Sequence, residues 1–307
     1  MGIHEEKILV LDGACGTSIQ DREIPPSAWD IYEGCNEYLN LSCPESITSI
    51  HESFLDAGAI IIETNTFGAN SIVLSEYGLQ DRTCEINRAA VENARKAIGN
   101  REGRYIAGSV GPTTKLPSLG HITVEALEQS LLEQMRALLE CGVDCLILET
   151  CQDILQARTG VIAAFELMEE MGIHLPLMVS VTIEQQGTML VGTDIGAVVA
   201  NFEPFPLFSL GLNCATGPED MLSHIRYLRD QWPLRISCIP NAGIPEIVGG
   251  ETRYPLVPEE FASRVSNFVL KEGVSVVGGC CGTTPAHIKA LTEALEGVEP
   301  AQREVEV

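Results

Sequence analysis

The stretch ITVEALEQSLLEQMRALLECGVDCLILET (residues 122–150) carries the pattern that decides the fold. In its first part, 122–142, apolar residues recur at helical spacing, and Thr123 and Gly142 stand where a helix would begin and end. Its second part, 143–150, is a short apolar run that is typical of a buried strand. A helix that leads directly into a buried strand indicates an α/β fold.

Seven further runs of this kind follow one another along the chain. Segments with helical periodicity, such as 218–231, separate them, and this alternation predicts parallel strands with right-handed crossovers. The runs are ILVLDGA (8–14), AIIIETNTF (59–67), YIAGSVGP (105–112), PLMVSVTI (176–183), LFSLGLNC (207–214), LRISCIPN (234–241) and VSVVGGCC (274–281).

Eight strand–helix units in about 290 residues predict a (β/α)8 TIM barrel. We expect one domain over residues 1–307, with a loose tail at about 298–307, and an extended excursion at REIPPSAWD (22–30). A doubly wound open sheet is the alternative. It would show fewer strands and a GxGxxG or Walker glycine pattern, and the sequence contains neither.

Amino-acid composition and net charge limit which kinds of molecule the protein can bind and indicate the cell compartment. The chain has 43 acidic and 19 basic residues and a formal charge of −24, which excludes nucleic acid and anionic membrane as favoured partners. The sequence shows no apolar run long enough for a membrane span, and its first residues, MGIHEEKILV, do not resemble a signal peptide. Eleven cysteines without such a signal indicate a reducing compartment, so we expect the cytoplasm.

In a TIM barrel, functional groups collect where the strands end at their carboxyl side. The ends of the predicted strands carry carboxylates, amides and three thiols, which should therefore meet at one mouth. These positions are Asp12, Gly13, Ala14, Glu63, Thr64, Asn65, Thr66, Gly111, Pro112, Glu149, Thr150, Asn213, Cys214, Asn241, Cys280 and Cys281.

Two adjacent cysteines, Cys280 and Cys281, end the last predicted strand, and Cys214 ends the sixth. The glycines in GGCCG (278–282) let the chain leave regular strand geometry, so both neighbouring sulfurs can turn inward. Three thiolates with one open position describe a catalytic zinc site. The alternatives are packing cysteines or a redox pair, but a vicinal disulfide is strained and the CxxC spacing is absent.

The other eight cysteines have no ligand-like spacing, and we expect most of them to fill the core. Two of them, Cys15 and Cys151, lie near the predicted mouth and have no assigned role. His51 and His287 are interpreted as helix or capping residues, because neither has a ligand-like position. The remaining cysteines are Cys35, Cys43, Cys84, Cys141, Cys145 and Cys238.

Several strand-end motifs together resemble a known family. The chain is similar to the homocysteine S-methyltransferase family over residues 8 to about 295, and within it to the homocysteine-binding barrel of the cobalamin-dependent methionine synthases. The motifs that carry the resemblance are LDGACGTSIQ (11–20), ETNTFGAN (63–70), GPTTKLP (111–117), LETCQDI (148–154), GLNCATGPE (211–219), PNAG (240–243) and GGCCGTTPAHI (278–288).

The resemblance implies a reaction and its site residues. It implies zinc bound by Cys214, Cys280 and Cys281 as the catalytic centre, and methyl transfer to the thiol of homocysteine to give methionine. It also implies that Asp12 and Glu149 hold the amino group of homocysteine. Backbone amides around residues 13–14 (Gly13 and Ala14) would receive its carboxylate. This agrees with elementary chemistry, because an ammonium needs carboxylates and a carboxylate needs exposed N–H groups.

The resemblance implies methylcobalamin as the methyl donor. ETNTFGAN (63–70) and NEYLNLSCPESI (36–47) resemble the cobalamin-dependent branch, so we expect a corrinoid-binding domain or a separate corrinoid protein as partner. The chain ends just after the barrel, as an excised fragment or a free-standing subunit would. The alternatives are another donor, such as S-methylmethionine, betaine or a methoxylated compound, or a non-catalytic module that binds zinc or homocysteine.

Overall fold

Eight parallel strands form the centre of the computed structural model, which describes residues 2–305. They are β1 (Leu9–Val10), β2 (Ile61–Glu63), β3 (Tyr105–Val110), β4 (Cys145–Cys151), β5 (Leu177–Val181), β6 (Ser209–Asn213), β7 (Arg235–Ile239) and β10 (Val276–Val277). They pair in the order β1-β10-β7-β6-β5-β4-β3-β2, and a parallel bridge between Leu11 and Ile61 joins β1 to β2. The sheet therefore closes on itself, and the predicted (β/α)8 TIM barrel is confirmed.

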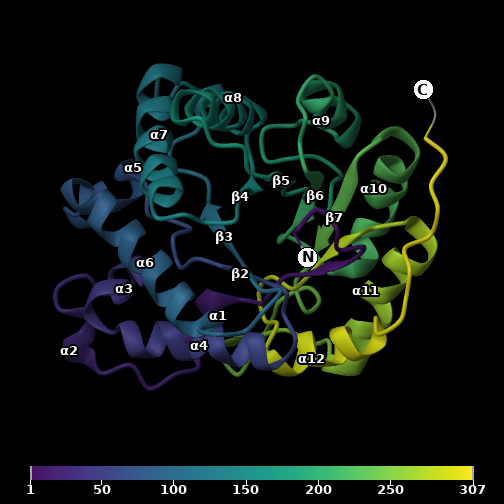
Figure 1. The fold of residues 1–307 in the computed structure, drawn as a ribbon, viewed down its shortest axis with the longest axis horizontal. Helices are drawn as coiled ribbons and strands as arrows, with labels where there is room; N and C mark the ends of the chain where they lie inside the picture. Colours follow the sequence, from purple (N-terminus) through teal and green to yellow (C-terminus); the bar gives the residue numbers. More distant parts are fainter. Residues whose placement is uncertain (1, 306–307) are drawn as a thin grey trace.

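Helices surround the strands as an outer ring (Figure 1). The α-helices are α1 (Cys15–Gln20), α2 (Pro26–Trp29), α3 (Leu39–Ser42), α4 (Pro44–Asp56), α5 (Ser71–Leu74), α6 (Thr83–Ile98), α7 (Val124–Glu140), α8 (Ile154–Met171), α9 (Ile195–Phe202), α10 (Pro218–Gln231), α11 (Pro258–Glu272) and α12 (Pro285–Ala294). Short 3-10 turns occupy Asn36–Tyr38, Ser75–Tyr77, Gln80–Arg82 and Pro117–Leu119. Among residues 2–305, no helix is both long and apolar enough to cross a lipid bilayer.

The helix that the sequence predicts most clearly begins and ends as expected. The Thr123 hydroxyl accepts a hydrogen bond from the Ala126 N–H at 3.2 Å and so caps the start of α7. The chain leaves α7 after Glu140, and Gly142 takes the left-handed conformation (φ 74°) that glycine adopts without strain. Helix α7 thus delivers the chain directly to the start of β4.

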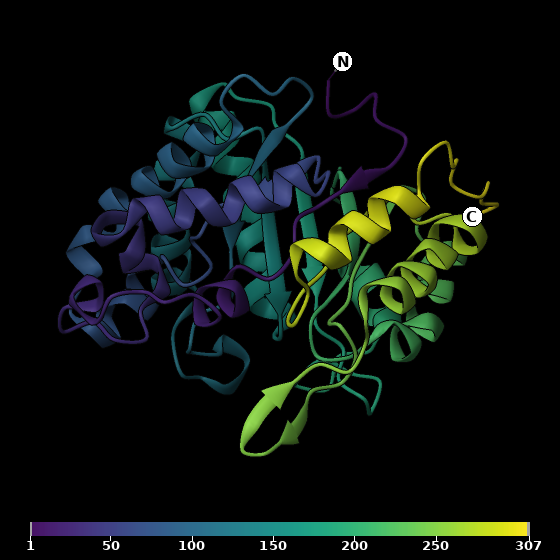
Figure 2. The same ribbon diagram turned by 90° about the horizontal axis from the view of Figure 1, so that it is seen from below.

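Two local features differ from the sequence-based expectation. The segment 22–30, expected to be extended, contains the short helix α2, which Pro26 begins because its missing N–H needs no partner there. An antiparallel hairpin, β8 (Glu246–Val248) and β9 (Glu251–Arg253), follows β7 and was not predicted. Figure 2 shows this hairpin projecting from the end of the barrel that lies opposite the N-terminus.

The core has two parts, as expected for a barrel inside a ring of helices. Side chains that fill the barrel interior come from alternating strand positions such as Leu9, Ile61, Ile147 and Met178, all at most 1% exposed. A larger aliphatic layer lies between the strands and the helices. Full burial of each such side chain contributes about 1.5–3 kcal/mol, so this layer holds the helices on the barrel.

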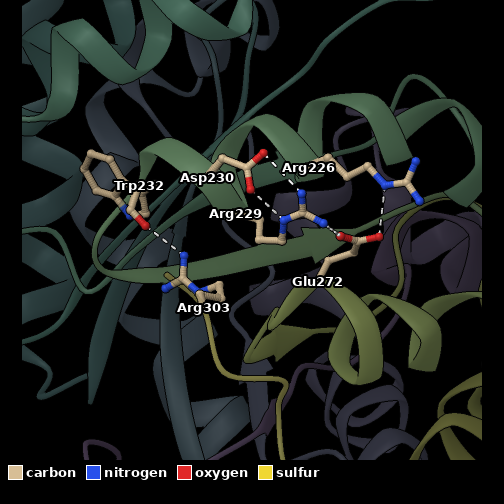
Figure 3. Close-up of polar contacts among 6 residues, drawn as sticks. All are labelled: Arg226, Arg229, Asp230, Trp232, Glu272 and Arg303. Carbon is tan, nitrogen blue, oxygen red and sulfur yellow. Dashed lines mark hydrogen bonds and ion pairs between the residues drawn. The ribbon is translucent and has the colours of Figure 1, made fainter. Parts of the chain in front are cut away.

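Ion pairs join α10 to α11, and hydrogen bonds attach the tail after α12 to the segment that follows α10 (Figure 3). Glu272, whose side chain is only 4% exposed, accepts from Arg226 at 3.1 Å and from Arg229 at 2.6 Å, so α11 is tied to α10. In the tail, Arg303 donates to the backbone oxygen of Trp232 at 2.7 Å. The described part of the tail, 298–305, has no helix or strand, but this contact attaches it to the barrel.

The buried His51 on α4 makes stability depend on pH. Its side chain is 0% exposed, and neither ring nitrogen has a hydrogen-bond partner within residues 2–305. Burial lowers the pKa of His51 to about 4, below its value of 6.5 in the unfolded chain. The unfolded chain therefore binds the proton first, so the contribution of His51 is complete above pH 6.5 and is lost as the pH falls towards 4.

We predict that His51→Leu removes this pH dependence. Between pH 7 and pH 5 the wild type should lose about 2 kcal/mol of unfolding free energy through His51, and the variant should not lose this part. Urea unfolding at both pH values measures the difference. An equivalent change at the exposed His121 serves as the control, and an equal pH-dependent loss in wild type and His51→Leu would contradict the prediction.

Candidate active site at the barrel mouth

A pocket of about 270 Å³ opens at the carboxyl ends of the strands. It contains the seven residues to which the sequence analysis gave a role: Asp12, Gly13, Ala14, Glu149, Cys214, Cys280 and Cys281. Four other strand-end positions that were expected at the mouth do not line it: Thr66, Gly111, Pro112 and Asn241. The same pocket is also lined by Cys15, Glu37, Glu63, Asn65, Ser109 and Asn213, among others. The closing of eight strand ends around one axis is what brings these distant positions together.

Three cysteine sulfurs form a cluster on one side of the pocket. The Sγ atoms of Cys214, Cys280 and Cys281 all lie within 4.8 Å of one another. Cys281 Sγ lies 3.9 Å from Cys214 Sγ and 4.0 Å from Cys280 Sγ. Sulfurs around a tetrahedral zinc, at a Zn–S distance of about 2.3 Å, would be about 3.8 Å apart. The cluster therefore fits a zinc ion with little adjustment.

Unusual backbone conformations aim the sulfurs at a common point. Cys214 follows β6 in the left-handed region (φ 61°), which turns its side chain out of the strand pattern. Gly282 also has a positive φ (77°), and a Cβ there would lie 2.2 Å from the Tyr254 ring. At Gly279 a Cβ would lie 2.4 Å from Thr283 Oγ1. The sequence predicts that these glycines free the backbone from strand geometry, and the positive φ of Gly282 agrees with this. Close packing at Gly279 and Gly282 is a second requirement, which the sequence did not indicate.

Hydrogen bonds hold this turn against its neighbours. The Cys281 N–H donates to Asn241 Oδ1 at 3.0 Å, and the Cys280 N–H donates to the Pro240 oxygen at 2.8 Å. Hydrogen bonds from the Cys214 and Cys280 thiols lower the pKa of Cys281 well below the usual thiol value. The cluster thus favours one thiolate even before a metal adds its charge.

Three carboxyl groups occupy another part of the pocket. Asp12 follows β1, and its Oδ2 accepts the backbone N–H of Glu63 at 3.1 Å, so the ends of β1 and β2 are joined. The carboxyl groups of Glu63 and Glu149 are hydrogen-bonded to each other. Desolvation raises the pKa of all three groups, because burial disfavours the charged form.

A register shift in β4 sets the direction of Glu149. The pairing of β4 with β5 is irregular between Leu148 and Cys151, and Thr150 within this bulge has φ 53°. Ser109 Oγ donates to Glu149 Oε1 at 2.5 Å, and Asn213 Nδ2 lies 3.4 Å from Oε2. The Asn213 amide also accepts from the Thr150 N–H at 2.9 Å, so one side chain supports the whole turn.

The backbone at 13–14 lies against the cysteine turn. The Ala14 N–H donates to Thr283 Oγ1 at 3.2 Å, so this predicted donor is already used within the protein. The Gly13 N–H has no acceptor among the described residues. A Cβ at Gly13 would lie 2.7 Å from both Phe54 and Thr283, so only glycine fits. Of the two predicted amides, Gly13 is the one that is free to receive a substrate carboxylate.

No lysine, arginine or histidine lines the pocket within the described part of the chain. Four thiols and four carboxyl groups thus line one pocket without a cationic side chain from the described residues. Burial of like charges is costly unless they are protonated or matched by cations. The arrangement therefore favours positively charged occupants, such as a metal ion at the sulfurs and an ammonium at the carboxylates.

The structure also places the residues whose roles were left open. Cys15 lines the pocket, and its thiol lies 3.7 Å from Asn65 Oδ1, whereas Cys151 is buried in the core beside the mouth. His287 caps α12 by accepting from the Thr284 N–H at 3.1 Å, so the prediction of a capping role is confirmed. Tyr254, whose ring packs against Gly282 and which interacts with the Cys281 thiol, follows the unpredicted hairpin and had no sequence signal.

Comparisons with known proteins agree with one another. The model of the family described as homocysteine S-methyltransferase matches residues 9–295. Methionine synthase of Mycobacterium tuberculosis (strain ATCC 25618 / H37Rv) is 38% identical over 99% of this chain, and that of Mycobacterium leprae (strain TN) is 40% identical over 94%. The chain spans about a quarter of the length of these relatives, 26% and 24% respectively.

Solved structures give the same result. The homocysteine methyltransferase of Escherichia coli in its metallated form has a TM-score of 0.75 and 26% identity, covering 94% of this chain and 96% of that protein. Its apo form has a TM-score of 0.70 and 25% identity. The likeness thus extends over almost the whole of both chains.

From the sulfur geometry we predict that the purified protein binds about one Zn²⁺ per chain. Cys214→Ala, Cys280→Ala and Cys281→Ala should each lose most of this metal, because two thiolates cannot replace a three-thiolate site. Elemental analysis after dialysis measures the occupancy. Cys151→Ala is the matched control, since it removes a buried thiol near the mouth but outside the cluster. Full occupancy in any of the three variants would remove that residue from the ligand set.

Proposed function

Because the chain belongs to the homocysteine S-methyltransferase family, we propose that it transfers a methyl group to the thiol of homocysteine and so forms methionine. The observation that carries the proposal is one pocket that holds three clustered sulfurs and, in another part, the carboxyl groups of Asp12, Glu63 and Glu149, without a cationic side chain from the described residues. Homocysteine has a thiol, an ammonium and a carboxylate. The pocket offers a place for each of these groups.

In this proposal Cys214, Cys280 and Cys281 hold the metal, and their spacing supports zinc. Zinc bound there would supply a Lewis acid whose open position takes the substrate thiol and favours loss of its proton. Three cysteine thiolates bring more negative charge than a divalent ion neutralises. Their excess charge would keep the substrate sulfur electron-rich, and therefore reactive towards an electrophilic methyl group.

The other contacts would orient the substrate. Asp12 and Glu149 would hold the ammonium, and the Gly13 N–H would receive the carboxylate. Ser109 and Asn213 fix the Glu149 carboxyl group, so this contact is preorganised before substrate arrives. With both the ammonium and the carboxylate fixed, the thiol would be left to meet the sulfur cluster, which lines the same pocket.

For the donor, we propose methylcobalamin carried by another domain or by a separate corrinoid protein. Support comes from the similarity to two methionine synthases and from the motifs at 36–47 and 63–70 that resemble the cobalamin-dependent branch. We place the reaction in the cytoplasm, because all eleven cysteines are free thiols, as is typical of a reducing compartment.

A donor assay tests this function. Zinc-loaded protein is incubated with homocysteine and methylcobalamin, S-methylmethionine or betaine in turn, and methionine is measured. We expect turnover with methylcobalamin and its loss in Cys280→Ala. If only S-methylmethionine or betaine gives methionine, the proposed methyl transfer stands but the proposed donor, methylcobalamin, is wrong. If the protein binds homocysteine but forms no methionine from any donor, including a methylated corrinoid protein, it is a binding module and the proposed activity is wrong.

We further predict that Glu149→Gln weakens homocysteine binding but leaves zinc bound. Loss of one partner of a desolvated charge pair costs about 2–5 kcal/mol, which is about thirtyfold to several thousandfold in affinity. Titration calorimetry on the zinc-loaded variant measures this change.

A thiol without an amino group provides the control for this prediction. Binding of 3-mercaptopropionate should be weak in both proteins and nearly unchanged by Glu149→Gln, whereas misfolding would weaken every ligand alike. Equal homocysteine affinity in the two proteins, with zinc intact, would show that Glu149 only supports the mouth.

A further inference from the structure

Glu63 is a pocket residue to which the proposed function gives no role. It ends β2, lines the same pocket as Asp12 and Glu149, and interacts with the carboxyl groups of both. Its backbone N–H donates to Asp12 Oδ2 at 3.1 Å, and its side chain is hydrogen-bonded to that of Glu149. Three carboxyl groups from β1, β2 and β4 thus meet in one part of the pocket.

A hydrogen bond between two carboxyl groups requires a proton between them, since two carboxylates at that distance repel each other. Ser109 Oγ and Asn213 Nδ2 already donate to Glu149, which favours the ionised form of Glu149. Glu63 is therefore the donor of the pair. Its own pKa is raised well above the usual range by burial and by the charges of Glu149 and Asp12.

Among residues 2–305, no cationic side chain lines the pocket around Glu63. The titratable groups that interact with it are Asp12, Glu149, Cys15 and Cys145. Burial raises the pKa of both thiols far above neutrality, so they stay uncharged. Glu37, a partly buried acid, lines the pocket but accepts a hydrogen bond from the Gly68 N–H at 2.7 Å. Only a ligand can bring positive charge to the three carboxyl groups.

We propose that Glu63 is the third carboxyl group of the ammonium subsite, and that it releases the proton it shares with Glu149 when a primary amino group binds. This inference rests on the proposed function, because it assumes an amino-acid substrate. A primary ammonium has three N–H donors, and Asp12, Glu63 and Glu149 provide one carboxylate for each. The ammonium keeps its three protons, the proton of Glu63 passes to solvent, and no covalent bond of the ligand changes.

L-Methionine is the probe, because its thioether has no proton to lose and cannot mimic the release from a thiol. In zinc-loaded protein the three cluster thiols hold no protons either. Calorimetry in two buffers of different ionisation enthalpy gives the number of protons released on binding. For the wild type we expect affinity to rise about tenfold per pH unit below the pKa of the pair and then to level off.

Glu63→Gln keeps a hydrogen-bond donor to Glu149 but cannot ionise. When it binds L-methionine, this variant should release one proton fewer than the wild type. The affinities of the two proteins for L-methionine should be similar at acid pH and should differ more as the pH rises. Glu37→Gln is the matched control, because it removes the charge of a partly buried carboxyl group in the same pocket, outside the group formed by Asp12, Glu63 and Glu149. The control should release as many protons as the wild type.

Two results would overturn the inference. One is that the heat of L-methionine binding to the wild type is the same in both buffers. This measurement does not depend on whether a variant folds. The other is equal proton release by Glu63→Gln and wild type. Either result leaves the proposed methyl transfer intact. A failure of both L-methionine and L-homocysteine to bind at any pH would instead overturn the proposed function, and this inference with it.

Discussion

Four thiols and four carboxyl groups line the pocket at the barrel mouth, and no cationic side chain of the described residues lies among them. In water each of these groups would be well solvated, but in the pocket their charges repel and lack hydration. The free-energy cost of this repulsion is lower because some groups keep their protons and others accept hydrogen bonds, as Glu149 does from Ser109 and Asn213. Selectivity for positively charged occupants follows from this balance.

The barrel supplies the rigid frame that such a pocket needs. The first and last strands of the sheet order, β1 and β2, would lie far apart if the sheet were open. Closure through the Leu11–Ile61 bridge instead places Asp12 beside Glu63. The deviations from regular strand geometry occur at this end, at the Thr150 bulge and at Cys214 with its positive φ. Backbone strain of this kind is stable only where the neighbouring structure holds it in place. Here Asn213 and the tightly packed glycines provide that support.

Sequence periodicity was sufficient to predict all eight barrel strands, because buried parallel strands appear as continuous apolar runs. The rule that functional groups gather at strand ends also predicts, from the sequence alone, that the three cysteines, Asp12 and Glu149 lie at one mouth. The rule placed Glu63 there too but gave it no role, since its pairing with Glu149 depends on side-chain direction. The use of the Ala14 N–H by Thr283 and the position of Tyr254 depend on contacts between distant segments, which periodicity does not encode.

Both ends of the described chain lie away from the β8–β9 hairpin that marks the mouth. Figure 2 shows the two termini near one end of the molecule and the hairpin at the other, and Arg303 holds the tail beside the start of β7. Attachment of the protein to a solid support by either end would therefore leave the mouth facing the solution. A second module joined at either end would reach the mouth only through a linker as long as the barrel is high, so linker length would control the local concentration of that module at the pocket.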